Sequence, residues 1–198
     1  MVDDIPPPIP EDHHDQHRHP RRTPRTQRRG HTRGTSNARY HQLVAAGTGG
    51  LSVAASINEF GQGAHAVVMQ IAATAVGVPI ECVKVQLGDT DATPYGGGNW
   101  GSRGTGIGGE AVFQAGKALR DNILRFVARL EESESSLLHV RDGNVVDAMS
   151  GTVKMTLEEV ARTAYFRTDR VPRDFQPELT VTRSYAQKAY AGVFTNGI

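Results

Sequence analysis

The sequence of 198 residues contains a single cysteine, Cys82, which excludes an internal disulfide and a metal site made of several cysteines. It has no apolar run near the roughly 18 residues that a membrane span requires. The N-terminus lacks the charged and then apolar layout of a secretory signal. The net charge of +1 predicts no strong attraction to nucleic acid or to a membrane surface. Together these absences favour a soluble, cytoplasmic protein.

The first part of the sequence is poor in large apolar residues. Residues 1–41 contain a proline run, several histidines and a cluster of arginines, so they cannot bury enough surface to offset the entropy lost on ordering. A solvated tail is favoured over a histidine-rich metal-binding tract, and over an arginine arm for nucleic acid, which would need interleaved aromatic residues. We predict a disordered tail over residues 1–46, a folded domain over residues 47–198, and regular structure from about Leu51.

The folded part alternates between two apolar periodicities. Apolar residues at every second position indicate half-buried strands, and apolar residues at three- and four-residue spacing indicate helices. Gly77 followed by Pro79 ends one helix, and Thr156 with Glu159 forms a capping box that opens another. The order of the elements predicts an α+β fold in which helices pack on a mixed sheet. The predicted strands are 51–57, 83–87, 137–140, 145–146 and 180–185, and the predicted helices are 64–76, 110–130 and 156–165.

Glycine is concentrated in two turns, each of which runs into a predicted helix. Phe60-Gly61-Gln62-Gly63 precedes one helix, and the segment from Gly96 to Gly106 precedes another. A helix start offers free backbone N–H groups and the positive end of a dipole, and glycine lets an anion approach them. Gln62 adds an amide that can donate and accept, and Arg103 adds a guanidinium that can bind phosphate or carboxylate. We therefore predict that a ligand with phosphate or another anionic group is held between the two turns.

Other patterns can be explained either by a structural role or by a functional one. Gly104 to Gly109 match the G-x-G-x-x-G pattern of dinucleotide-binding turns, but that reading requires a strand directly before the pattern. Gly88-Asp89-Thr90-Asp91 is interpreted as a turn with side-chain-to-backbone hydrogen bonds, and not as a metal site. Cys82 is predicted to be a small core residue in a strand, and His65 a helix-start histidine.

Several segments occur in a fixed order along the chain. They are Glu59 to His65, Gln70 to Ala72, Gly77 to Pro79, Gly88 to Tyr95, Trp100 to Thr105, and the closing run from Tyr190 to Ile198. With these segments in this order, the sequence resembles the large, molybdopterin-binding subunit of the xanthine dehydrogenase/aldehyde oxidase family, in its bacterial branch with carbon-monoxide-dehydrogenase-like members. The resemblance covers about residues 47–198, whereas residues 1–46 do not look like the family.

The resemblance implies a partial second molybdopterin-binding domain of a molybdenum hydroxylase, which inserts water-derived oxygen into an aldehyde, an N-heterocycle or a similar small molecule. It implies a molybdopterin cofactor in a dinucleotide form, and iron–sulfur and FAD groups on partner subunits. Carried over by position, Gln62 and Gly63 would bind the pterin and phosphate part. Trp100, Gly101, Ser102 and Arg103 would line the cofactor near the metal.

No catalytic residue and no metal ligand is assigned, because the glutamate motif that serves as the base in the family would lie beyond Ile198. The chain is therefore predicted to be a fragment that carries part of the cofactor cradle and does not catalyse alone. Two alternatives stay open. One is a non-catalytic truncated remnant, and the other is a nucleotide-binding module that uses the Gly104–Gly109 turn.

Overall fold

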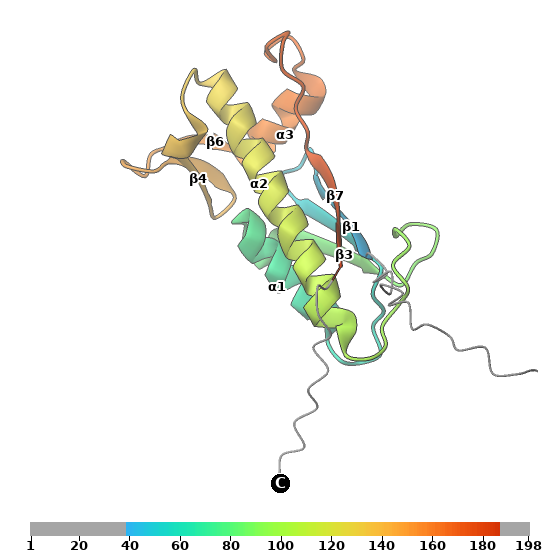
Figure 1. The fold of residues 1–198 in the computed structure, drawn as a ribbon. Helices are drawn as coiled ribbons and strands as arrows, with labels where there is room; N and C mark the ends of the chain where they lie inside the picture. The colour runs from blue at the N-terminus through green and yellow to red at the C-terminus, as the bar shows by residue number, and fades with distance from the viewer. Residues whose placement is uncertain (1–38, 187–198) are drawn as a thin grey trace, which may run out of the picture. The chain divides into compact units, whose positions relative to one another are not determined.

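The computed structural model describes residues 39–186, and a four-stranded mixed sheet forms its centre. Strand β1 (Arg39–Ala45) pairs antiparallel with β2 (Leu51–Ala55) and with β7 (Thr180–Tyr185). Strand β2 pairs in parallel with β3 (Val83–Leu87), because the chain crosses over through a helix between them. The order across the sheet is β3-β2-β1-β7 (Figure 1).

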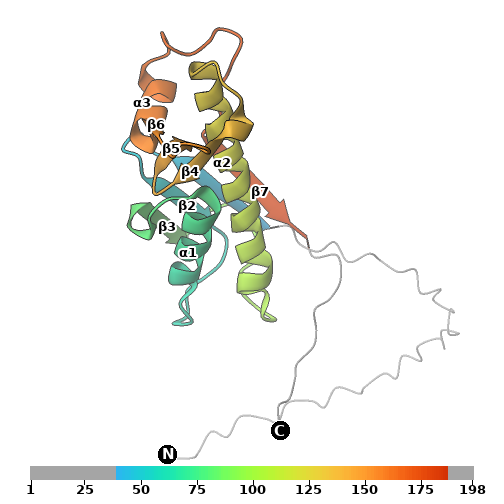
Figure 2. The ribbon, with the colours of Figure 1, turned by 90° about the vertical axis from the view of Figure 1, so that its left-hand side faces the viewer.

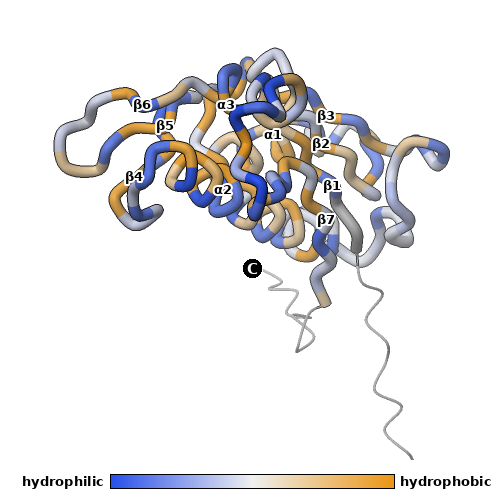
Figure 3. Tube along the Cα trace, turned by 90° about the horizontal axis from the view of Figure 1, so that it is seen from above, coloured by the Kyte–Doolittle hydropathy of each residue, from blue (hydrophilic) through white to orange (hydrophobic). Residues whose placement is uncertain are grey.

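Two helices pack side by side on one face of this sheet (Figure 2). Helix α1 (Ala64–Val76) connects β2 to β3, and α2 (Glu110–Leu130) contacts α1, β1 and β7. Hydrophobic and hydrophilic residues alternate along α2 (Figure 3). Its hydrophobic residues, such as Leu119, Ile123 and Phe126, are buried in the core, and the helix contacts β1 and β7 of the sheet. Gly116 of α2 lets the helices approach closely, because a Cβ there would lie 2.5 Å from the Cβ of Ala75. The largest fully buried side chains of this core are Phe126, Leu43, Leu51, Leu119, Ile123, Leu157, Val53, Val68, Val76 and Val112.

A smaller antiparallel sheet follows α2. It contains β4 (Leu138–Arg141), β5 (Asn144–Asp147) and β6 (Val153–Thr156), in the order β4-β5-β6. Helix α3 (Leu157–Phe166) starts directly after β6 with the predicted capping box, in which the Thr156 hydroxyl accepts from the Glu159 N–H and the Glu159 carboxylate accepts from the Thr156 N–H. No helix in the part of the chain described here is long and apolar enough to cross a membrane.

The structure confirms the α+β class and the mixed sheet with helices packed on it, and it also gives α1, α2 and β3 the predicted bounds. The prediction that regular structure begins near Leu51 was wrong. Strand β1 (Arg39–Ala45) lies before Leu51 and also before residue 47. Strand β6 was not predicted. Cys82 lies half-buried in a 3-10 turn (Ile80–Cys82), so its placement in a strand was wrong. Most of the predicted tail, and the closing run after residue 186, lie outside the described residues.

Candidate functional site

The two glycine-bearing turns lie at one end of the helical layer. Helices α1 and α2 run in the same direction, and their N-terminal ends lie at the same end of the domain in Figures 1 and 2. The first turn joins β2 to α1, and the second belongs to the long connection from β3 to α2. The tertiary structure therefore brings the predicted site residues of both turns to one end of the fold.

The N-terminus of α1 is already capped by a carboxylate of the chain, that of Glu59. One Glu59 oxygen accepts from the backbone N–H of Gly61 at 2.8 Å and of Gly63 at 3.0 Å. The other accepts from the N–H of His65 at 3.0 Å and lies 3.4 Å from His65 Nδ1. These bonds, that of the His65 N–H first, lower the pKa of Glu59 to about 2. A carboxylate of the chain thus occupies this helix start, whereas the sequence-based prediction was an anionic ligand held between the two turns.

The side-chain amide of Gln62 folds back onto its own turn. Its Oε1 accepts from the Phe60 N–H at 2.6 Å, and its Nε2 donates to the Asn58 carbonyl oxygen at 2.8 Å. Gly61 and Gly63 have positive φ angles of 96° and 79°, and a Cβ on either would meet no atom within 4 Å. The turn is therefore a preformed, exposed loop whose glycines leave open space on the outside. The amide of Gln62 retains one further N–H and one further acceptor position.

The second turn has an unusual backbone. Gly97, Gly98 and Gly101 have φ angles of 75°, 66° and 58°, and Ser102 has a φ angle of 56° although it carries a side chain. A left-handed conformation costs a residue with a Cβ about 1–2 kcal/mol, so Ser102 carries local backbone strain. From Gly96 to Gly109 the turn contains no Asp or Glu, so no carboxylate of its own sequence competes with an anionic ligand.

Arg103 and Trp100 form one unit within this turn. Arg103 is only 9% exposed, and its guanidinium carbon lies 4.6 Å from the centre of the Trp100 ring, a cation–π distance. Trp100 is 64% exposed and donates from Nε1 to the carbonyl oxygen of Gly97 at 3.1 Å. The structure therefore buries this positive charge beside an exposed aromatic ring.

Asn99 links the second turn to the first. Its Nδ2 donates to the carbonyl oxygen of Asn58 at 2.7 Å, the same oxygen that receives Gln62 Nε2. Its Oδ1 is buried and has no hydrogen-bond partner among the described residues. A Cβ at Gly104 would lie 3.1 Å from this Oδ1, so a side chain there would press on the Asn99 amide.

The wide helical turn Gly104–Gly109 packs against α1. A Cβ at Gly109 would lie 2.8 Å from Ile71 Cδ1, so a side chain there would displace this methyl group. The strand before it, β3, ends at Leu87, and a loop of the second turn intervenes. The structure therefore lacks the strand–turn–helix context that the nucleotide-binding interpretation of Gly104–Gly109 requires.

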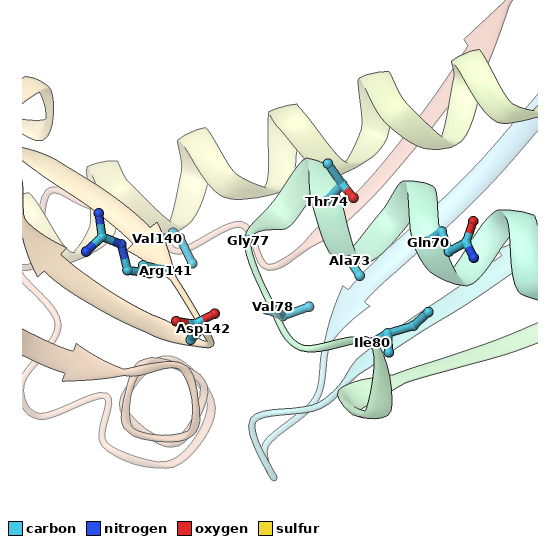
Figure 4. Close-up of a pocket in the computed structure, with 9 residues that line it drawn as sticks. All are labelled: Gln70, Ala73, Thr74, Gly77, Val78, Ile80, Val140, Arg141 and Asp142. Atoms are coloured by element: carbon cyan, nitrogen blue, oxygen red, sulfur yellow. The ribbon is translucent and has the colours of Figure 1, made fainter.

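Other candidate positions have structural roles. Asp89 accepts from the N–H groups of Asp91 and Ala92 through Oδ1, so the Gly88–Asp91 segment is the predicted side-chain-to-backbone turn. Within residues 39–186, no group of three or more His, Cys, Asp or Glu side chains is arranged to hold a metal ion. A groove of about 430 Å³ lies near the other end of α1, between its C-terminal half and the β4–β5 hairpin (Figure 4). It contains none of the predicted site residues.

Glu59, Asn58 and Asn99 are the residues of this site that sequence reasoning missed. Glu59 stands in the segment that carries the family resemblance, but no role followed from its position. A carboxylate two residues before a glycine, and five before the first residue of the predicted helix, was the available signal. The link from Asn99 to Asn58 joins residues 41 positions apart and has no local signal.

Comparison with known proteins gives consistent matches. The model of the family described as the molybdopterin cofactor-binding domain matches residues 26–197. The nicotine 6-hydroxylase large subunit of Paenarthrobacter nicotinovorans is 28% identical over 76% of this chain and 18% of its own length. The carbon monoxide dehydrogenase large chain of Hydrogenophaga pseudoflava is 32% identical over 63% of this chain and 15% of its own length.

A solved structure has a similar fold. The crystal structure of quinoline 2-oxidoreductase from Pseudomonas putida 86 superposes with a TM-score of 0.70 and 31% sequence identity, and the match covers 76% of this chain and 19% of that one. The chain thus spans less than a fifth of the length of each of these three proteins.

Proposed function

The chain belongs to the molybdopterin cofactor-binding domain family, and we propose that its two glycine-bearing turns are part of the cofactor cradle of a molybdenum hydroxylase large subunit. The observation that carries the proposal is the convergence of both turns, linked through the Asn58 carbonyl, at one end of the fold. Gln62 and Gly63 would contact the pterin, and Trp100, Gly101, Ser102 and Arg103 would contact the remainder of the cofactor.

The residues of the two turns fit a molybdopterin group. The second turn offers a buried guanidinium, several glycines with positive φ angles and no carboxylate, which suits a phosphate. Asn99 Oδ1, a buried acceptor without a partner among the described residues, suits an N–H group of a ligand. When bound, the cofactor would supply the two-electron oxidation and oxygen transfer of the hydroxylase reaction. The chain's own residues would bind and orient it.

The first turn suits a pterin edge better than a phosphate. Its charged group is the Glu59 carboxylate, which repels a second anion. The Gln62 amide can hydrogen-bond a neutral heterocycle, and the open space beside Gly61 and Gly63 lets such a group approach. The sequence-based proposal that Gln62 and Gly63 bind both pterin and phosphate is therefore narrowed to the pterin.

The wider features of the proposal follow from the family resemblance. They are a dinucleotide form of the cofactor, partner subunits with iron–sulfur and FAD groups, and an aldehyde, N-heterocycle or similar small molecule as substrate. Because the chain spans less than a fifth of its relatives, these features concern a longer subunit or assembly. A cytoplasmic location stays a prediction, as does the loss of catalysis in the isolated chain.

The experiment is a measurement of molybdenum and pterin in the chain purified from a host grown with molybdate. We expect pterin to copurify with the wild-type chain, and Arg103→Gln to lower the pterin content at least severalfold. Arg173→Gln, a substitution at an exposed arginine far along the sequence from both turns, is the control. Circular dichroism would establish that all three chains are folded. A folded wild-type chain without pterin or molybdenum would reject the proposal and favour the truncated remnant.

A further inference from the structure

Three backbone N–H groups of the first turn donate hydrogen bonds to one carboxylate, that of Glu59. Glu59 accepts from Gly61, Gly63 and His65, and its side chain is only 29% exposed although it lies in a surface loop. A carboxylate in this arrangement satisfies N–H groups that no helical carbonyl can reach, because the first residues of a helix lack intrahelical acceptors. The N-terminus of α1 therefore has its anion before any ligand arrives.

The same turn presents the residues assigned to the pterin. Gln62 lies between the two glycines whose N–H groups Glu59 holds, and its amide is anchored to Phe60 and Asn58. Neither Gly61 nor Gly63 has a neighbour within 4 Å on its Cβ side. Because glycine itself prefers no single conformation, the Glu59 hydrogen bonds help to hold Gly61 and Gly63 at their positive φ angles.

We propose that Glu59 is a positioning residue, which fixes the Gly61–Gly63 turn for the pterin and excludes phosphate from the N-terminus of α1. The inference rests on the proposed function for its cofactor part, and it assigns the phosphate of the cofactor to the second turn. Two anions cannot share one helix start without repulsion, and Glu59 is covalently tethered there. The division of roles is pterin at the first turn and phosphate beside Arg103 at the second.

The test compares the wild-type chain with Glu59→Gln, Glu59→Asp and the control Glu81→Gln, which alters an exposed glutamate of the Ile80–Cys82 turn. Amide hydrogen exchange would be measured by NMR at Gly61, Gly63 and His65. We expect exchange at these amides to be about tenfold faster in Glu59→Gln, because a charged acceptor is lost, and unchanged in Glu81→Gln. Unaltered exchange in Glu59→Gln would overturn the positioning role.

The second measurement titrates inorganic phosphate and follows the same amide signals. In the wild-type chain we expect no saturable shift at Gly61, Gly63 or His65. In Glu59→Gln we expect one at millimolar phosphate, which a merely structural role would not produce. Phosphate-induced shifts at these amides in the wild-type chain, or their absence in Glu59→Gln, would overturn the exclusion of phosphate.

Pterin content is the third measurement. We expect it to fall severalfold in Glu59→Gln and to be partly restored in Glu59→Asp, which keeps the charge on a shorter side chain. A Glu59→Gln chain that shows fast exchange but keeps the wild-type pterin content would reject the proposal that pterin binding depends on the conformation of the first turn. A wild-type chain that binds no pterin would instead reject the proposed function, and exchange and phosphate binding would still decide the role of Glu59 at the helix start.

Discussion

The side chain of Asn99 donates from Nδ2 to the backbone carbonyl oxygen of Asn58 at 2.7 Å. This oxygen also accepts from Gln62 Nε2 at 2.8 Å, so one atom joins the two glycine-bearing turns. Because β2 runs into the first turn and the second turn runs into α2, the link also connects the sheet to the start of the longest helix. The geometry of each turn therefore depends on the other.

Removal of this link should loosen the second turn. Asn99→Ala is expected to lower the free energy of unfolding by about 1 kcal/mol and to speed amide exchange from Gly97 to Ser102. Asn144→Ala is the matched control, because its side chain donates only to the nearby Asp142 carbonyl in the hairpin. Denaturant unfolding and amide exchange would measure both. Equal exchange at the second turn in the two variants would contradict a link between the turns.

The αL glycine at the end of α1 should tolerate no side chain. Gly77 has a φ angle of 94°, and a Cβ there would lie 2.6 Å from the carbonyl oxygen of Val140. Gly77→Ala is expected to cost about 3 kcal/mol, from left-handed strain and overpacking together. Gly61→Ala has nearly the same φ angle, 96°, and open space around its Cβ, so it should cost about 1 kcal/mol of strain alone. Urea unfolding would measure the difference, and equal losses would refute the close contact.

The stability of the domain should decrease in acid, partly through Glu59. Its pKa is lowered from 4.5 to about 2 by the His65, Gly63 and Gly61 N–H groups. A lowered folded-state pKa means that the contribution is complete above about pH 4.5 and is lost as the pH falls towards 2. A carbon-13 NMR titration should place the Glu59 midpoint near 2, and Glu59→Gln should weaken the acid dependence of unfolding. A midpoint near 4.5 would show that the three bonds are absent in solution.

The capping box of α3 should contribute measurably to stability. Thr156→Ala removes the hydroxyl that accepts from the Glu159 N–H at 3.1 Å, and should cost about 1 kcal/mol. Thr74→Ala, at an exposed site of α1, is expected to change the free energy of unfolding by less than about 0.5 kcal/mol. The midpoints of thermal unfolding of the two variants would be compared. Equal midpoints would mean that the Thr156 cap is not formed.

Features that depend on neighbouring residues could be predicted from the sequence. The sequence places Gly63 and Gly77 at the two ends of α1, and the structure confirms both, because helix periodicity and terminal glycines are encoded within one stretch of chain. The capping box at Thr156 and the strand Val83–Leu87 are confirmed for the same reason. The chemical character of the two turns also follows from the sequence alone.

Long-range features were decided only in the tertiary structure. Strand β1 has a weak local pattern, and it exists because β2 and β7 pair with it from opposite sides, the latter from more than a hundred residues away along the chain. The burial of Arg103 under Trp100 and the Asn99–Asn58 link likewise depend on which loops the packed helices bring together. Local sequence encodes the three helices, the caps at Gly77 and Thr156, and the carboxylate-free second turn, since these depend on neighbouring residues. Only the folded chain decided that Glu59 occupies the first helix start, because that outcome requires a particular loop conformation and not merely a residue type.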